Sequence, residues 1–95
     1  TYKGSGVTSI PETAIKIDSS YIGDGYGLPS KKTLDAIRLA ASLEGIAFDP
    51  VYSGKALQAL IDKTILGDLD DYSDVILIHT GGAFVLPVYQ EAITG

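Results

Sequence analysis

The sequence Asp49-Pro50-Val51-Tyr52-Ser53-Gly54-Lys55 stands between a short apolar run, residues 46–48, and a helical pattern that begins near Gly54. Proline cannot donate a hydrogen bond to a central β-ladder, so the apolar run is predicted to be a strand that ends here. In open α/β sheets, ligands bind beyond the carboxyl ends of the strands, where each strand gives way to a helix. We therefore expect the polar residues of this stretch to lie at a ligand site.

Composition sets limits on what the chain does. Its 95 residues suffice for one small domain, and a hydrophobic content of 45% is typical of a globular protein. A net charge of −5 argues against a nucleic-acid partner, which needs clustered Lys and Arg. No apolar run approaches the roughly 18 residues that span a bilayer. We expect a cytoplasmic protein without a membrane partner.

Hydrophobic spacing predicts two helices. The first covers residues 31–43, with Ser30 as its N-cap and Gly45 as its stop. The second covers residues 54–66 and ends before Gly67, with four residues turned inward: Leu57, Leu60, Ile61 and Ile65. A final helix over residues 83–93 is expected to be interrupted at Pro87.

Three segments are predicted to be strands. Residues 14–18 alternate apolar and polar side chains, residues 46–48 are apolar, and residues 74–79 contain four consecutive aliphatic side chains. Such a run is typical of a parallel strand covered by helices on both faces. The predicted fold is therefore α/β, a partial three-layer open sheet with a βαβ unit. Residues 1–13 are predicted to be irregular, and residues 14–95 to form the α/β domain.

Two further loops accompany the central stretch. Tyr26 stands between two glycines, which predicts a backbone bent to present its ring, and residues 79–82 read His-Thr-Gly-Gly. The structural alternatives remain open: Ser53 as an N-cap, Tyr52 as a half-buried core residue, and the Gly pair as a tight turn. His79 is more typical of a structural residue than of a base. No spacing of His and carboxylates completes a metal site.

The motifs together resemble one family in order and spacing: residues 24–30, 43–45, 49–56 and 77–82. They are similar to the C-terminal part of the D-cysteine desulfhydrase and 1-aminocyclopropane-1-carboxylate (ACC) deaminase family. These are enzymes of the tryptophan synthase β-like fold that depend on pyridoxal 5′-phosphate (PLP). The resemblance covers roughly residues 14–93 and implies a homodimer, a small amino-acid substrate and a PLP-binding domain.

The resemblance also implies roles for individual residues. Tyr26 and Tyr52 match two active-site tyrosines that position the substrate and move protons. Ser53 and Thr80 match the positions that distinguish the subfamilies, with Gly81 beside them at the cofactor. ACC deaminases carry Glu and Leu at these two positions, whereas D-cysteine desulfhydrases carry Ser or Thr. On this basis the chain is expected to belong to a D-cysteine desulfhydrase, with ACC deaminase as the alternative.

The Ser53 assignment has a physical argument behind it. A glutamate at the pyridine nitrogen would strengthen the ring as an electron sink, whereas a hydroxyl offers only a neutral hydrogen bond. Elimination of a thiolate from D-cysteine, giving pyruvate, hydrogen sulfide and ammonia, tolerates the weaker sink because the leaving group accepts the electrons. Opening a cyclopropane has no comparable leaving group. Ser53 therefore favours elimination.

The chain is also expected to be part of a longer protein. It contains no methionine, and it opens Thr1-Tyr2-Lys3-Gly4. The lysine that forms the Schiff base with the cofactor belongs to an N-terminal family motif that this sequence lacks, and Lys55 does not match it. We therefore expect the chain to be inactive by itself and to need the remainder of the enzyme. A non-catalytic binding module that keeps the fold is the rival hypothesis.

Overall fold

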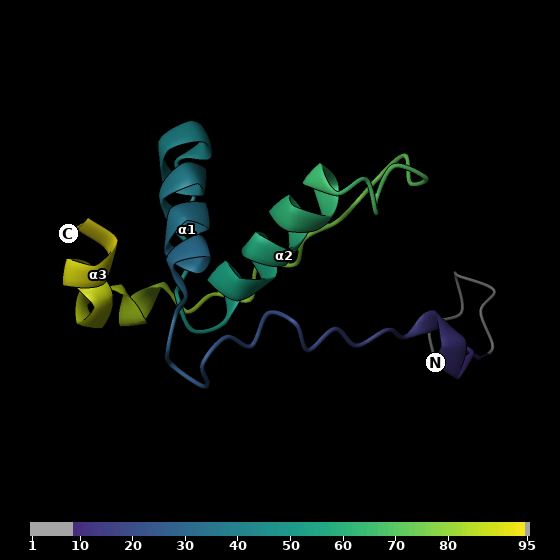
Figure 1. Ribbon diagram of the computed structural model, residues 1–95, viewed down its shortest axis with the longest axis horizontal. Coiled ribbons are helices and arrows are strands. Elements are labelled where there is room, and N and C mark those ends of the chain that lie inside the picture. Colours follow the sequence, from purple (N-terminus) through teal and green to yellow (C-terminus); the bar gives the residue numbers. More distant parts are fainter. Residues whose placement is uncertain (1–8, 95) are drawn as a thin grey trace.

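The computed structural model describes residues 9–94, and its regular elements are helical. A 3₁₀ turn, η1 (Glu12–Ala14), precedes a long irregular segment that leads to α1 (Lys31–Glu44). A short connection leads to α2 (Ser53–Ile65), and the chain closes with η2 (Ala83–Tyr89) and α3 (Gln90–Thr94). In Figure 1, α2 is inclined to α1, and α3 lies beside α1 on the side away from α2.

The two long helices confirm the sequence predictions. The side chain of Ser30 accepts a hydrogen bond from the Thr33 N–H at 3.2 Å, and Gly45 ends α1 in the left-handed conformation at φ +65°. Helix α2 ends before Gly67, which also has a positive φ, of +81°. However, Ser53 is the first residue of α2 rather than its N-cap, and Tyr52 at the cap position makes no capping hydrogen bond through its side chain.

A small core holds α1 against α2. Its buried apolar residues are Ala36, Ile37, Phe48 and Leu57. Gly54 allows the close approach, because a Cβ there would lie 2.8 Å from Cδ1 of Ile37 and 2.4 Å from the Asp49 carbonyl oxygen. Of the residues predicted to turn inward, Leu60 and Ile61 are half-buried, whereas Ile65 is 77% exposed.

The predicted α/β sheet was wrong. Residues 9–94 contain no strand, and the segments 14–18, 46–48 and 74–79 are irregular. A strand requires a neighbour that satisfies its N–H and C=O groups, and no backbone hydrogen bond joins residues 46–48 to 74–79. The aliphatic run is not covered on both faces either, since Ile76 and Ile78 are 86% and 75% exposed. Its composition fits a buried strand, but the described chain supplies no ladder partner.

The C-terminal segment is interrupted at Pro87 as predicted, as a 3₁₀ helix followed by a short α-helix. Arg38 of α1 holds this end, because Nε donates to the Ile93 carbonyl at 2.5 Å and Nη2 donates to the Ala92 carbonyl at 2.7 Å. Of the predicted irregular segment 1–13, residues 1–8 lie outside the described residues. In the described part of the chain no helix is long and apolar enough to cross a membrane.

Candidate functional site

A buried carboxylate organises the start of α2. Asp49 has no exposed surface, and its oxygens accept hydrogen bonds from the N–H groups of Val51, Tyr52 and Ser53 at 2.9, 2.6 and 2.9 Å. The Ser53 hydroxyl donates a fourth, at 2.5 Å. The first N–H groups of a helix have no partner inside the helix; in α2, Asp49 accepts from Ser53 through its carboxylate and from Gly54 through its backbone carbonyl, at 2.7 Å. Asp49 is thus the capping residue of α2, the role for which Ser53 was a candidate.

The pKa of Asp49 reflects the same contacts. Burial alone would raise the pKa of this carboxyl group, since it disfavours the charged form. The hydrogen bond from the Ser53 hydroxyl and those from the three backbone N–H groups outweigh burial, so the pKa of Asp49 lies below its ordinary value. Asp49 is therefore charged at neutral pH.

The His79–Gly82 segment packs directly on this carboxylate. Gly82 has a φ of +94°, and a Cβ there would lie 2.6 Å from Oδ1 of Asp49, so no larger residue fits beside it. The Ser53 hydroxyl oxygen lies 3.5 Å from the Gly81 carbonyl oxygen. Ser53 and Gly81, both predicted to lie at the cofactor, are therefore neighbours, although Ser53 itself is only 3% exposed.

His79 has a structural role in this arrangement. The Gly81 N–H donates to Nδ1 at 3.0 Å, so Nε2 carries the proton that is shared with the Ala47 carbonyl oxygen at 2.7 Å. The imidazole also stacks on the ring of Phe48, with centroids 4.5 Å apart. Both ring nitrogens are occupied, and His79 fixes the turn that carries Thr80 and Gly81.

The two predicted active-site tyrosines meet. Their hydroxyl groups share a hydrogen bond, and the rings of Tyr26 and Tyr52 are arranged edge to face with centroids 5.9 Å apart. Both remain open to solvent, at 78% and 50% exposed. The hydrogen bond with Tyr26 raises the pKa of Tyr52 above its ordinary value, because neutral Tyr52 donates its hydroxyl proton to Tyr26 and loses that donated bond when it ionises.

The structure thus forms two pairs among the predicted residues, Tyr26 with Tyr52 and Ser53 with Gly81. Thr80 is exposed and makes no hydrogen bond to any described residue. Sequence reasoning missed Asp49 as the capping residue. The signal was present, because an aspartate in a turn commonly accepts a hydrogen bond from the backbone N–H two residues later.

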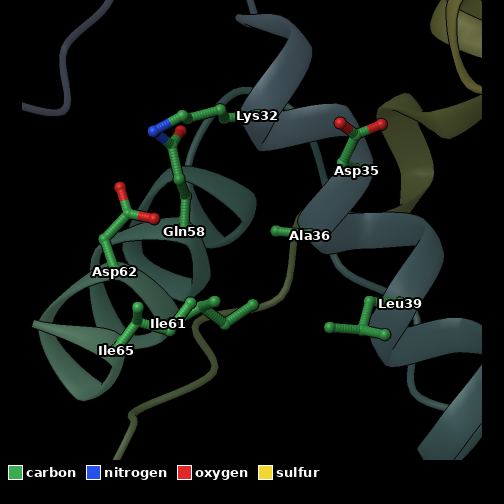
Figure 2. Close-up of a pocket in the computed structure, with 8 residues that line it drawn as sticks. All are labelled: Lys32, Asp35, Ala36, Leu39, Gln58, Ile61, Asp62 and Ile65. Carbon is green, nitrogen blue, oxygen red and sulfur yellow. The ribbon is translucent and has the colours of Figure 1, made fainter.

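A hollow lies away from these residues, between α1 and α2 (Figure 2). It has a volume of about 430 Å³ and is lined by Lys32, Asp35, Ala36, Leu39, Gln58, Ile61, Asp62 and Ile65. None of the predicted site residues lines it. Tyr52 instead lines a hollow of about 300 Å³ together with Ile22 and Lys55. Within the described range, no three His, Cys, Asp or Glu residues are grouped as metal ligands.

Comparison with known proteins now identifies the family. The model of the family described as "Pyridoxal-phosphate dependent enzyme" matches residues 1–81. The chain belongs to this family. Among curated relatives, the ACC deaminase of Burkholderia ambifaria (strain MC40-6) is 46% identical over 82 residues, which are 86% of this chain and 24% of that protein. That of Burkholderia cenocepacia (strain HI2424) is 49% identical over 81 residues, 85% of this chain and 24% of that protein.

The chain spans about a quarter of the length of these relatives. Their names support the alternative, ACC deaminase, better than the D-cysteine desulfhydrase that Ser53 and Thr80 indicated. The family depends on PLP, and the exposed phenols and the Gly81 turn fit one edge of such a cofactor. The N-terminus of α2 does not fit its phosphate group, because the charged carboxylate of Asp49 already lies there, bound to the Ser53 N–H, and the Asp49 carbonyl binds the Gly54 N–H.

Proposed function

We propose that the whole protein is a PLP-dependent deaminase and that its substrate is ACC. The observation that carries this proposal is the exposed pair of tyrosines, Tyr26 and Tyr52, whose hydroxyl groups share one hydrogen bond in a chain of the PLP family. Phenols in this arrangement hold and pass a proton within reach of a bound substrate. The names of the relatives support ACC as the substrate.

The cofactor, when bound, supplies an electron sink, and the protein orients it and tunes its charge. In the proposal, Tyr26 and Tyr52 hold the proton that moves to or from the substrate. Ser53, Thr80 and Gly81 line the edge of the cofactor. Asp49 stands behind Ser53, as the acceptor of its hydroxyl proton at 2.5 Å.

The Asp49 contact weakens the argument that Ser53 excludes ring opening. Ser53 is not an isolated neutral hydroxyl, because it donates to the Asp49 carboxylate. A hydroxyl that donates to a carboxylate is polarised, and its oxygen accepts a further hydrogen bond more strongly. The Ser53–Asp49 pair therefore brings negative charge towards the position that Glu holds in ACC deaminases of the family.

D-Cysteine desulfhydration is the second candidate. The observation that favours it is the pair of small hydroxyl residues, Ser53 and Thr80, at the two positions that separate the subfamilies. With either substrate, we propose that the whole protein is a cytoplasmic homodimer. Within this chain, the PLP-binding domain of the whole enzyme would begin at residue 14. Residues outside this chain, including the Schiff-base lysine, would complete the site.

Ammonia release distinguishes the two candidates. The whole protein is loaded with PLP and assayed with ACC and with D-cysteine, and sulfide release is followed in parallel. We expect a higher kcat/KM for ACC. A higher value for D-cysteine, with one sulfide per ammonia, would replace the proposal by the second candidate. Turnover of neither substrate would favour the non-catalytic module.

The tyrosines are tested in the same assay. We expect Tyr26→Phe and Tyr52→Phe each to lower kcat by about 10²-fold, the low end of the usual contribution of a proton-transferring side chain. Tyr72→Phe is the matched control, because Tyr72 is exposed and lies in the acidic turn after α2. Equal activity of all three variants and the wild type would remove the tyrosine pair from the mechanism.

A further inference from the structure

The loop that carries Tyr26 has few contacts of its own. Gly23, Gly25 and Gly27 adopt positive φ angles, and Ile22 and Leu28 are 56% and 54% exposed. A loop this rich in glycine, without buried side chains, has no packing that fixes its position. The meeting of Tyr26 with Tyr52 therefore depends on polar contacts made from outside the loop.

Lys55 supplies two of these contacts. Its Nζ donates hydrogen bonds to the Ile22 carbonyl at 2.6 Å and to the Gly25 carbonyl at 3.0 Å. Gly25 directly precedes Tyr26, and Lys55 lies in the first turn of α2, three residues after Tyr52. One side chain thus ties the backbone beside the first tyrosine to the helix that follows the second.

A second side chain holds the far side of the loop. The Tyr89 hydroxyl of η2 donates to the Gly27 carbonyl at 2.7 Å. The backbone on both sides of Tyr26 is thus fixed, by Lys55 before it and by Tyr89 after it. Lys55 makes the greater contribution, because charge-assisted hydrogen bonds are roughly twice as strong as neutral ones.

We propose that Lys55 is a positioning residue that holds the Tyr26 loop against α2 and so brings the two phenol hydroxyls together. It does this as a hydrogen-bond donor to backbone carbonyls, which leaves no part for it as a nucleophile. Its consequence for catalysis rests on the proposed function, but the positioning itself does not. In the whole enzyme, Lys55→Met is expected to lower kcat, as Tyr26→Phe is.

The test follows the ionisation of Tyr52 in the chain without cofactor or substrate. Tyrosine is labelled with ¹³C at Cζ, the Tyr52 resonance is assigned with Tyr52→Phe, and its pKa is measured by NMR. Tyr26→Phe gives the pKa without the shared hydrogen bond; Asp49 and Tyr89 still face Tyr52 in that variant. We expect Lys55→Met to lower the pKa of Tyr52 to that reference value.

Two variants serve as controls. Lys55→Arg keeps a cationic donor and is expected to restore most of the wild-type pKa of Tyr52, which a loss of packing alone would not do. Lys31→Met removes an exposed lysine that pairs with Asp35 and is expected to change nothing. A Tyr52 pKa that falls in Tyr26→Phe but stays at the wild-type value in Lys55→Met would overturn the proposal.

A measurement on the wild-type chain covers the case in which Lys55→Met loses its helical circular dichroism. Exchange of the Lys55 ammonium protons with water is compared by ¹⁵N NMR with that of Lys32, an exposed residue of α1. We expect slower exchange at Lys55, and equal rates would contradict the proposal. Because neither readout requires PLP or substrate, these outcomes are independent of whether the whole protein deaminates ACC.

Discussion

The two tyrosines of the candidate site are held in opposite ways. Tyr52 lies in the turn before α2, where the N–H groups of residues 51–53 bind the buried carboxylate of Asp49, with Gly82 packed against it. Tyr26 lies on an exposed glycine loop held by Lys55 and Tyr89. One half of the site is thus part of the core, and the other half is attached to it. Changes near Asp49 should therefore affect stability, whereas changes at the loop contacts should affect geometry.

The largest effect is expected for Asp49→Asn. The amide cannot accept all four hydrogen bonds, and each buried donor left without a partner costs about 1–3 kcal/mol. We expect the free energy of unfolding to fall by about 3–5 kcal/mol, on the basis of that cost for more than one donor. Urea unfolding followed by circular dichroism measures it. Asp71→Asn, in the exposed acidic turn, is the control, and equal stabilities of the two variants would contradict the role of Asp49.

The next largest effect on the free energy of unfolding is expected at two neighbouring glycines. Gly81 and Gly82 have almost the same φ, +93° and +94°, but only a Cβ at Gly82 would meet Asp49; none of the described atoms lies within 4 Å at Gly81. We expect Gly81→Ala to cost about 1–2 kcal/mol through backbone strain alone. Gly82→Ala adds overpacking of about 1–3 kcal/mol. The difference between the two variants isolates the contact with Asp49, and a difference of zero would contradict it.

Acid should weaken the Asp49 half of the site. Because the pKa of Asp49 is lowered in the folded state, its contribution to stability is present above the unfolded-state pKa of about 3.9 and is lost as pH falls through the folded-state value. Asp18 contributes in the same direction, since hydrogen bonds from Ser20 and Lys63 lower its pKa. Asp35, whose pKa is lowered by the hydrogen bond from Lys31, adds a third contribution. We therefore expect Asp18→Asn combined with Asp49→Asn to have a weaker acid dependence of unfolding than either single variant, with the part due to Asp35 remaining.

The smallest effect is expected for Tyr89→Phe. It removes the single hydrogen bond to the Gly27 carbonyl, which contributes about 0.5–1.5 kcal/mol. Tyr72→Phe, at an exposed tyrosine, gives the baseline for the urea midpoint. A loss at Tyr89 as large as that at Asp49 would mean that the loop belongs to the core, and the contrast between the two halves would disappear.

The contrast also explains what could be read from the sequence. The bounds of α1 and α2 follow from local signals: Ser30 before the first helix, and Gly45 and Gly67 after the two. The absence of a sheet could not be read from local signals, because a strand depends on partner strands that residues 9–94 do not provide. The aliphatic run 74–79 carries no information about such partners. The resemblance predicts a role for the tyrosines, but Lys55 could not be found from the sequence, because its acceptors lie 30 and 33 residues away.

The most direct test of the account is the distance between the rings of Tyr26 and Tyr52. In a chain whose only protonated aromatic rings are tyrosines, an NOE experiment detects ring protons within about 5 Å. With centroids 5.9 Å apart and an edge-to-face arrangement, we expect a cross-peak between the two rings. It should be absent in Tyr26→Phe, where the phenylalanine ring is deuterated. A wild-type spectrum in which both rings are assigned and no cross-peak joins them would contradict the account.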